Sequence, residues 1–383
     1  MRNIPIENPL QRFRAEHVEY FGTPPVANLV VYEDQSESVL SENKSPDLSF
    51  RYSLNPYRGC AHGCAYCYAR PSHEYWGFGI GTDFERKLMV KPRAPELLRA
   101  AFEKKSWQGE VVVLSGNTDC YQPLELKWQL TRRCLEVFLD YTNPVGIITK
   151  SALIERDMDL LQELNEKAQL WVAVSIPFWD ADVARGMEPY VPTPQRRIET
   201  IRRLARRGIG VTVMVAPVIP GLSDRDMPKV LERAADAGAR RASYTMLRLP
   251  HGVQQVFKQR LTRHLPLAKD KVLARTREVR GGALHDGAFF SRMRGQGHYA
   301  KTVRGLFEKS AARLGLLPEE PKQCAVSTFR RPTDAGGQLR LFAQCVQSRV
   351  PVAEPTSRPR GSMTPAWTVK ARKRLPIGPR KRR

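Results

Sequence analysis

Residues 55 to 71 read NPYRGCAHGCAYCYARP and hold three of the seven cysteines of the chain. Cys60, Cys64 and Cys67 follow the spacing C-x3-C-x2-C, with tyrosine, arginine and glycine around them and no fourth cysteine nearby. Thiolates this close in sequence can converge on one inorganic centre. The nature of that centre therefore bears on both the fold and the function.

Two inorganic centres are compatible with three clustered cysteines. A structural zinc site is closed by four ligands, commonly as two cysteine pairs, and no second pair is present here. His62 lies between the first two cysteines, where a ligand would strain so short a loop. A four-iron cluster has four iron corners, so three cysteines leave one iron open for a substrate or cofactor. The spacing favours the iron–sulfur cluster, and a zinc knuckle with a distant fourth ligand is the alternative.

The composition is that of a folded protein, with 383 residues, 42% of them hydrophobic and 26% charged. The longest apolar stretch, residues 209–222, is interrupted by Gly210, Pro217 and Pro220, which makes it too short to cross a membrane. The first residues contain no apolar core of a secretory signal. We therefore expect a cytoplasmic protein without a membrane partner, in which clustered thiols serve a metal or catalysis rather than disulfides.

The net charge of +23 is concentrated in the C-terminal third. Residues 239–313 hold seventeen Lys or Arg against four acids, residues 350–383 hold ten Lys or Arg and one Glu, and the rest is close to neutral. Such a region can bind a polyanion, so nucleic acid is a possible partner. The alternative is a solvated basic surface followed by a disordered tail.

Short β-branched runs alternate with amphipathic stretches between about residues 51 and 265. The predicted strands lie near 51–55, 111–114, 146–149, 170–176, 210–216 and 242–247. The predicted helices lie near 94–105, 125–139, 154–167, 193–207 and 224–237. Thr193 before Pro194 is typical of a helix N-cap followed by proline in the first turn. Alternation of this kind predicts βαβ units and a parallel sheet.

Four regions follow from this pattern. Residues 1–50 read as an irregular N-terminal arm, 51–265 as the barrel, 266–349 as a basic helical appendage and 350–383 as a disordered basic tail. The predicted fold class is α/β, a partial (β/α)6 TIM-like barrel of parallel strands with that helical appendage. A doubly wound sheet is the alternative.

Polar residues follow the predicted strands where each one ends. In βα barrels the chemistry takes place at this edge, the C-terminal ends of the strands. The residues concerned are Asn117, Thr118, Asp119, Thr149, Lys150, Ser175 and Arg248. Each also has an ordinary reading, since Thr118 and Asp119 can cap a helix and Ser175 can end a strand.

The cysteine stretch resembles the radical S-adenosylmethionine (radical SAM) superfamily, whose signature is C-x3-C-x2-C with an aromatic residue before the last cysteine, here Tyr66. The run CAYCYARP and the later segments TDCYQPLE, ITKSALIERD, AVSIPF and VAPVIPG are most similar to spore photoproduct lyase and its uncharacterised bacterial relatives. The resemblance covers about residues 50–265.

This resemblance implies a partial barrel, a [4Fe-4S] cluster on Cys60, Cys64 and Cys67, and S-adenosyl-L-methionine (SAM) chelated by the open iron. It implies an enzyme whose reduced cluster cleaves SAM to a 5′-deoxyadenosyl radical that abstracts hydrogen from a substrate. It also implies a reductant such as flavodoxin or ferredoxin. The matching SAM contacts are Tyr66, Thr118, Lys150 and Ser175, with Asp119 as a weaker candidate.

Two residues are candidates for the radical chemistry itself. Tyr68 matches a tyrosine that the lyase uses near its radical, although aromatic packing explains it equally well. The lyase's hydrogen-donating cysteine has no counterpart in the stretch SGNTD, and Cys120 just beyond it is a hypothetical substitute. Thymine-dimer repair is therefore not carried over.

Three functions remain to be distinguished. A radical SAM enzyme acting on nucleic acid is favoured, with basic residues contacting phosphates and Trp76, Phe78 and Tyr121 as candidates to stack on a base. A radical SAM enzyme acting on a protein or peptide is the second. The third is a non-enzymatic nucleic-acid-binding module stapled by a metal, which would be a colourless zinc protein that leaves SAM intact.

Overall fold

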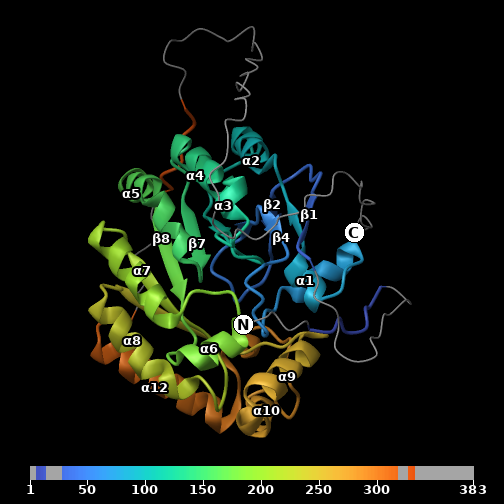
Figure 1. The fold of residues 1–383 in the computed structure, drawn as a ribbon. Coiled ribbons are helices and arrows are strands. Elements are labelled where there is room, and N and C mark those ends of the chain that lie inside the picture. The colour runs from blue at the N-terminus through green and yellow to red at the C-terminus, as the bar shows by residue number, and fades with distance from the viewer. Residues whose placement is uncertain (1–5, 14–27, 318–326, 333–383) are drawn as a thin grey trace, which may run out of the picture.

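The computed structural model describes residues 6–13, 28–317 and 327–332, and Figure 1 shows its parallel strands enclosed by helices. Six parallel strands form the main sheet: β3 (Tyr52–Leu54), β6 (Val112–Leu114), β7 (Val145–Thr149), β8 (Leu170–Ser175), β9 (Val211–Val218) and β10 (Arg241–Met246). They neighbour one another in the same order as in the chain. The α/β class and the parallel sheet of a partial barrel are thereby confirmed.

One further strand extends the main sheet beyond β3. β2 (Leu40–Glu42) pairs antiparallel with β3, with Leu40 opposite Leu54. The seven-stranded sheet therefore runs β10-β9-β8-β7-β6-β3-β2 and is open, because β10 and β2 are its two ends. The carboxyl ends of the six parallel strands meet at one edge, where the candidate polar residues lie.

Helices between the strands cover the outside of this sheet, as the alternating pattern predicts (Figure 1). They are α2 (Ala94–Glu103), α3 (Glu125–Trp128), α4 (Leu130–Asp140), η2 (Ala152–Asp157), α5 (Met158–Lys167), α6 (Ala181–Met187), α7 (Pro194–Arg206), η3 (Asp224–Asp226) and α8 (Met227–Asp236). The Thr193 hydroxyl accepts the Arg196 N–H at 3.3 Å, which confirms the predicted cap of α7. The predicted helix at 125–139 is divided at Gln129, whose φ of 48° is left-handed.

A second, three-stranded sheet lies beside the cysteine segment. It consists of β1 (Val30–Glu33), β5 (Lys87–Val90) and β4 (Tyr57–Arg58), in the order β1-β5-β4. The sequence predicts an irregular arm over residues 1–50, whereas β1 pairs in parallel with β5 and β2 joins the main sheet. Their partners lie far along the chain, so no local pattern marks them. Between these strands stand η1 (Arg70–Trp76) and α1 (Thr82–Arg86).

The C-terminal helices pack on the end of the barrel beside α8 (Figure 1). They are α9 (Val253–His264), η4 (Pro266–Ala268), α10 (Lys269–Glu278), α11 (Ser291–Arg294) and α12 (Gly297–Arg313). Val303 and Phe307 of α12 belong to the same buried core as β9 and β10. The predicted tail at 350–383 lies outside the described residues. Within the described part, none of the helices has the length and hydrophobicity needed to cross a membrane.

A second buried cluster anchors the cysteine segment. Cys64, Ala65 and Tyr66 pack there against Phe178 and against side chains of α6, α9 and α10. The cysteine segment thus rests on the last helices of the chain as well as on the sheet.

Candidate functional site

The three cysteines lie on one series of tight turns between β4 and η1. The Cys60 N–H donates to the Phe84 carbonyl at 3.0 Å, and within the segment the Cys67 N–H donates to the Cys64 carbonyl at 3.3 Å. Gly59 has a φ of +70°, and a Cβ there would lie 2.7 Å from a Leu88 methyl and 2.9 Å from the Phe84 oxygen. Only glycine fits both that backbone conformation and that space. Gly59, directly before Cys60, is therefore a structural requirement of the turn.

Arg70 holds this segment from inside the protein. Its guanidinium is fully buried and donates to the carbonyl oxygens of Gly63 at 3.2 Å and of Cys64 at 2.9 and 3.0 Å. It also bonds the carbonyls of Ile80 and Gly81 and pairs with Glu85 at 2.5 Å. One side chain therefore fixes the backbone on both sides of Cys64.

Gln122 holds the opposite side of the segment. Its buried amide nitrogen donates to the Gly59 carbonyl, and its amide oxygen accepts the Ala61 N–H, each at 3.0 Å. Gln122 follows β6, so this pair of bonds ties Cys60 to the carboxyl edge of the main sheet. The cysteine segment is consequently positioned relative to the polar strand ends.

The three thiols are free and mostly covered, with Cys60 and Cys64 buried and Cys67 partly exposed. Burial raises the pKa of Cys60 to about 12, and burial followed by the Glu188 carboxylate raises the pKa of Cys64 well above its usual value. Both thiols are therefore protonated at neutral pH, and metal binding would release those protons. In the part of the chain that the structure describes, no three His, Cys, Asp or Glu side chains are grouped to hold a single metal ion. A four-iron cluster makes a different demand, because each cysteine binds a separate iron.

Tyr66 and Lys150 come together beside the cysteines. The Lys150 ammonium lies 5.9 Å from the centre of the Tyr66 ring, a cation–π arrangement. Asp119 joins them from the end of β6, where its carboxylate accepts the Lys150 N–H at 2.8 Å and the Thr149 hydroxyl at 2.7 Å. His62 is 3.5 Å from the same carboxylate. Asp119 is thus engaged by protein hydrogen bonds, and the Lys150 ammonium lies beside the Tyr66 ring at the strand ends.

A buried chain of polar groups links the cysteine segment to β8. The Tyr66 hydroxyl donates to Glu188, and Glu188 pairs with Arg197 of α7. Arg197 in turn donates to the Ser175 carbonyl at 2.7 Å. All of these side chains are buried, so the ion pair is protected from solvent and holds Tyr66 at a fixed position.

The two predicted hydroxyl contacts also lie at strand ends. Thr118 donates to the Tyr57 carbonyl, and Ser175 donates to the Ala216 carbonyl, each at 2.9 Å. With its hydrogen engaged in this way, each hydroxyl oxygen presents lone pairs, so both would act as acceptors. An ammonium group is the part of SAM that such acceptors suit. The SAM roles of these residues stay predictions.

The two candidates for radical chemistry occupy different environments. Tyr68 is 47% exposed, and its hydroxyl donates to the Gly116 carbonyl at 2.5 Å just after β6. Cys120 is fully buried in the main core, where its N–H donates to Ser115. That environment matches a packing role for Cys120 and excludes direct contact with solvent. Tyr121 is also fully buried, so the prediction that it stacks on a base is wrong.

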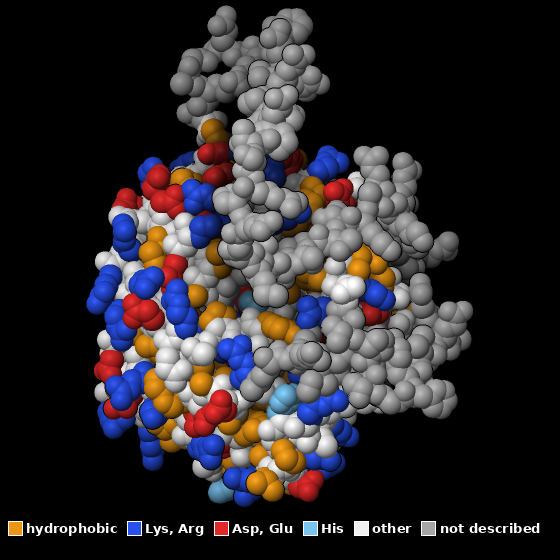
Figure 2. Space-filling model, in the orientation of Figure 1, with side chains coloured by type: hydrophobic (Ala, Val, Ile, Leu, Met, Phe, Trp, Pro, Cys, Tyr) orange, Lys and Arg blue, Asp and Glu red, His pale blue; other side chains and the backbone are white. Residues whose placement is uncertain are grey.

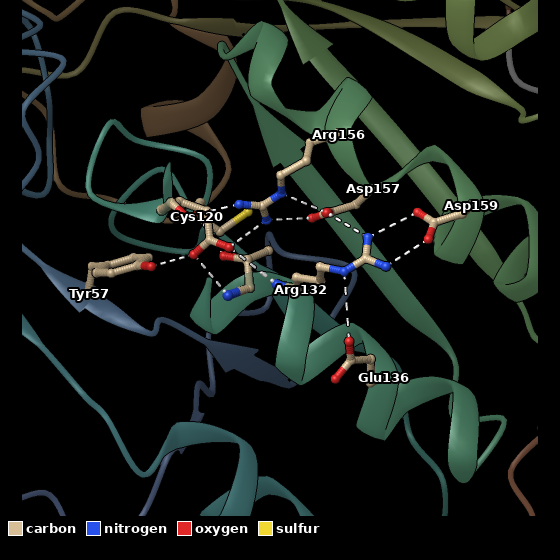
Figure 3. Close-up of polar contacts among 9 residues, drawn as sticks. Tyr57, Cys120, Arg132, Glu136, Arg156, Asp157 and Asp159 are labelled. Carbon is tan, nitrogen blue, oxygen red and sulfur yellow. Dashed lines mark hydrogen bonds and ion pairs between the residues drawn. The ribbon is translucent and has the colours of Figure 1, made fainter. Parts of the chain in front are cut away.

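A charged network buried behind Cys120 connects two neighbouring strand ends (Figure 3). Glu125 accepts the Tyr57 hydroxyl and pairs with Arg156 of η2 at 2.7 Å. Asp157 pairs with Arg156 at 2.8 Å and with Arg132 of α4 at 3.1 Å. Both carboxylates are fully buried, so the network rigidly joins the segment after β6, which carries Thr118 and Gln122, to the segment after β7.

Lowering the pH is expected to weaken the fold through His73, which packs beneath Gly59. Burial lowers the pKa of His73 to about 4 from an unfolded value near 6.5. The unfolded chain therefore takes up the proton first, and this contribution is complete above about pH 6.5 and is lost as the pH falls toward 4. The loss amounts to about 3 kcal/mol. It can be measured by urea unfolding of the metal-free protein across this range.

The matched variant for this measurement is His73→Gln. Glutamine keeps a donor for the Lys87 carbonyl, which His73 contacts at 2.8 Å, but does not titrate. Its stability should vary less with pH than that of the parent by about the amount above. An unchanged slope in the variant would assign the pH dependence elsewhere.

The Radical SAM superfamily model matches residues 54–234, which begin at the last residue of β3 and contain the cysteine segment and the parallel strands β6, β7, β8 and β9. An uncharacterised protein of Mycobacterium tuberculosis is 38% identical over 221 residues, covering 56% of this chain and 64% of the relative. An uncharacterised protein of Methanocaldococcus jannaschii is 30% identical over 174 residues, covering 45% and 62%. The chain thus spans less than two thirds of the length of these relatives.

Solved structures of spore photoproduct lyase share the fold. The complex with dinucleoside spore photoproduct has a TM-score of 0.54 at 15% identity, covering 76% of this chain and 81% of the lyase. At that identity the likeness establishes the fold. The family match identifies residues 54–234 as a radical SAM domain, and the likeness to the lyase agrees with its fold. The family predicted from the cysteine spacing is thereby confirmed, and radical SAM enzymes use a [4Fe-4S] cluster and SAM as cofactors.

Several supporting residues were not predicted from the sequence. Arg70 stands in the quoted stretch, but its burial depends on carbonyls brought in from residues 80 and 81. Arg197 does leave a signal, because it falls on the same helix face as Ile201 and Leu204. A charged residue on an apolar helix face indicates a buried partner, which here is Glu188.

Proposed function

We propose that this chain is a radical SAM enzyme that acts on nucleic acid. The observation that carries the enzyme proposal is the cysteine segment, in which three free thiols are clamped by Arg70 and Gln122 beside Tyr66 and Lys150. The donor set suits the group, since three thiols on one loop can hold three irons and leave the fourth open. When bound, the cluster supplies the electron that cleaves SAM.

The chain's own residues would bind and orient SAM. The Lys150 ammonium would pair with the SAM carboxylate. The hydroxyl oxygens of Thr118 and Ser175 would accept hydrogen bonds from the SAM ammonium. The Tyr66 ring, held by Glu188, would lie against the adenine. The surrounding buried clusters would limit water at the reacting atoms.

Two kinds of evidence support nucleic acid as the substrate class. The lyase structure that shares this fold contains a dinucleoside spore photoproduct, and a radical SAM isomerase of Pseudomonas phage M6 is 25% identical over 210 residues, 42% of that protein. The basic residues of 239–313 supply phosphate-binding groups. On the face seen in Figure 2, Lys and Arg side chains are mixed with acidic ones. Where a nucleic acid would bind therefore depends on the local arrangement of side chains as well as on the net charge.

A protein or peptide substrate and a metal-stapled binding module are the competing functions. A peptide enzyme would cleave SAM but show no salt-dependent retention of nucleic acid. A binding module would contain zinc and leave SAM intact. As an enzyme the chain would need an electron source for the cluster, and a protein reductant such as flavodoxin or ferredoxin, together with a cytoplasmic location, is part of this proposal.

The deciding experiment is anaerobic purification followed by reconstitution with iron and sulfide. The protein is then reduced with dithionite in the presence of SAM, and 5′-deoxyadenosine is measured by chromatography. A brown protein that produces 5′-deoxyadenosine supports the enzyme proposal. A colourless zinc protein that leaves SAM intact would overturn it in favour of the binding module.

A further inference from the structure

Arg248 is a partly buried cation without a carboxylate partner among the described residues. It lies two residues beyond the end of β10, at the carboxyl edge of the sheet, and its guanidinium lies 5.2 Å from the centre of the Tyr68 ring. Its Nε makes no hydrogen bond in the described part of the chain, and one Nη contacts the Met293 sulfur at 3.8 Å. Burying a guanidinium in this way costs free energy unless an anion pairs with it. Tyr68 follows Cys67, so this cation faces the candidate active site.

The segment 284–295 beside Arg248 displays two phenylalanines to solvent. Phe289 is 51% exposed and Phe290 is 63% exposed. Phe290 has a φ of +64°, a conformation that is rare and strained for a bulky residue. Its N–H donates to the Asp47 carboxylate at 3.1 Å, which helps to hold that conformation. Two exposed rings on a strained but fastened segment indicate a contact surface for another molecule.

This segment is fastened firmly to the end of β10. Arg280 donates to the carbonyls of Leu247 and Ser291, which joins the strand end to the segment. Asp47 pairs with Arg292 at 2.7 Å and so is occupied. The two phenylalanines are therefore presented from a fixed platform next to Arg248.

The charge around the platform is positive. Its cations are Arg248, Arg280, Arg292 and Arg294, with His285 close to the first two, and its acids are Asp47 and Asp286. Asp47 is used by Arg292, and Asp286 is used by Ser291 and the Ala288 N–H. Among the described residues no carboxylate pairs with Arg248, Arg280 or Arg294. Arg280 is engaged by backbone carbonyls and Arg294 lies over the Tyr244 ring, whereas the Arg248 Nε has no hydrogen-bond partner there. A ligand that brings both an anion and a flat apolar face would satisfy the cation and the rings together.

We propose that Arg248, Phe289 and Phe290 form the substrate-binding surface of this enzyme for single-stranded nucleic acid. Arg248 binds a backbone phosphate at the mouth of the barrel, and the two rings stack on neighbouring bases. The proposal rests on the proposed function, because it assumes that the substrate of the cysteine site is a nucleic acid. The unpaired cation favours this occupant over a peptide, since every nucleotide carries a phosphate beside a base.

The test measures binding of a fluorescein-labelled oligothymidylate to the full chain by anisotropy, over a series of salt concentrations. Arg248→Gln should weaken binding about tenfold and reduce the slope of log affinity against log salt by about 0.7. Phe289→Ala and Phe290→Gly should each weaken it about fivefold or more. Phe290→Gly suits the positive φ, so it should keep thermal stability, measured by circular dichroism, and separate binding from folding. The matched controls are Arg206→Gln at the exposed end of α7, outside the basic region 239–313, and Leu267→Ala, both expected to bind like the parent.

A second oligonucleotide of the same length, built from abasic deoxyribose phosphates, separates the two contacts. Arg248→Gln should weaken its binding, whereas the phenylalanine variants should not. Parent-like binding by folded Arg248→Gln and Phe290→Gly would overturn the proposal and assign nucleic-acid affinity to other basic residues. The proposal would also be overturned if Arg248→Gln weakened the binding of an acidic peptide as much as that of the oligonucleotide while the phenylalanine variants bound both like the parent. Because these assays need neither cluster nor SAM, the failure of this surface and the failure of SAM cleavage are observed separately.

Discussion

Replacing Cys60, Cys64 and Cys67 together by alanine is expected to abolish iron binding and 5′-deoxyadenosine formation. Each thiol would hold a different iron of the cluster, and the five described cysteines include just two others, both fully buried away from solvent. The loss should be complete within detection, because no SAM can be reduced without the cluster. The measurements are iron and sulfide content, visible absorbance and 5′-deoxyadenosine by chromatography.

Cys134→Ala provides the matched control for the triad. Cys134 lies on α4 in the main core, so its removal costs packing but should leave iron content and SAM cleavage as in the parent. Far-ultraviolet circular dichroism would show that both proteins are folded. Full iron content in the triple variant would place the cluster on other residues and contradict the assignment of the site.

The barrel could be predicted from the sequence because its signals are local. Each central strand is a short β-branched run buried on both faces, such as Val112–Leu114, and each is followed by an amphipathic helix. The caps are local too, as Thr193 shows. The second sheet leaves no comparable signal. Val30–Glu33 becomes a strand because Lys87–Val90 lies beside it, and that partner is more than fifty residues away.

The candidate site divides in the same way. The cysteine spacing and the polar strand ends are visible in the sequence, and the structure brings Tyr66 and Lys150 together there. What surrounds them depends on distant pairing. Glu188 meets Tyr66 and Arg197 meets Glu188 only in the folded chain. The exposure of a residue also depends on this packing, which is why Tyr121 proves to be core while Phe289 is at the surface.

Arg70→Lys is expected to destabilise the metal-free protein by about 3–5 kcal/mol, the usual cost of breaking a buried charge pair. The guanidinium fork reaches four carbonyls and Glu85 at once, and a lysine ammonium has three donors in a different arrangement. Carbonyls of Gly63 and Cys64 would lose their donors in a place that water does not reach. Urea unfolding of the metal-free variant measures the change in the free energy of unfolding.

Arg70→Lys should also impair cluster assembly for a reason separate from stability. The arginine fixes the backbone around Cys64, so its loss lets the three thiols move relative to one another and lowers the iron retained after reconstitution. The matched control is Arg133→Lys, whose partner Glu96 is exposed and whose ion pair is worth less than about 1 kcal/mol. Iron content is compared at a temperature where both variants are folded. Full iron retention with parent-like stability in Arg70→Lys would mean that the turns around the cysteines hold their shape without this clamp, leaving Gly59 and Gln122 as the residues that set it.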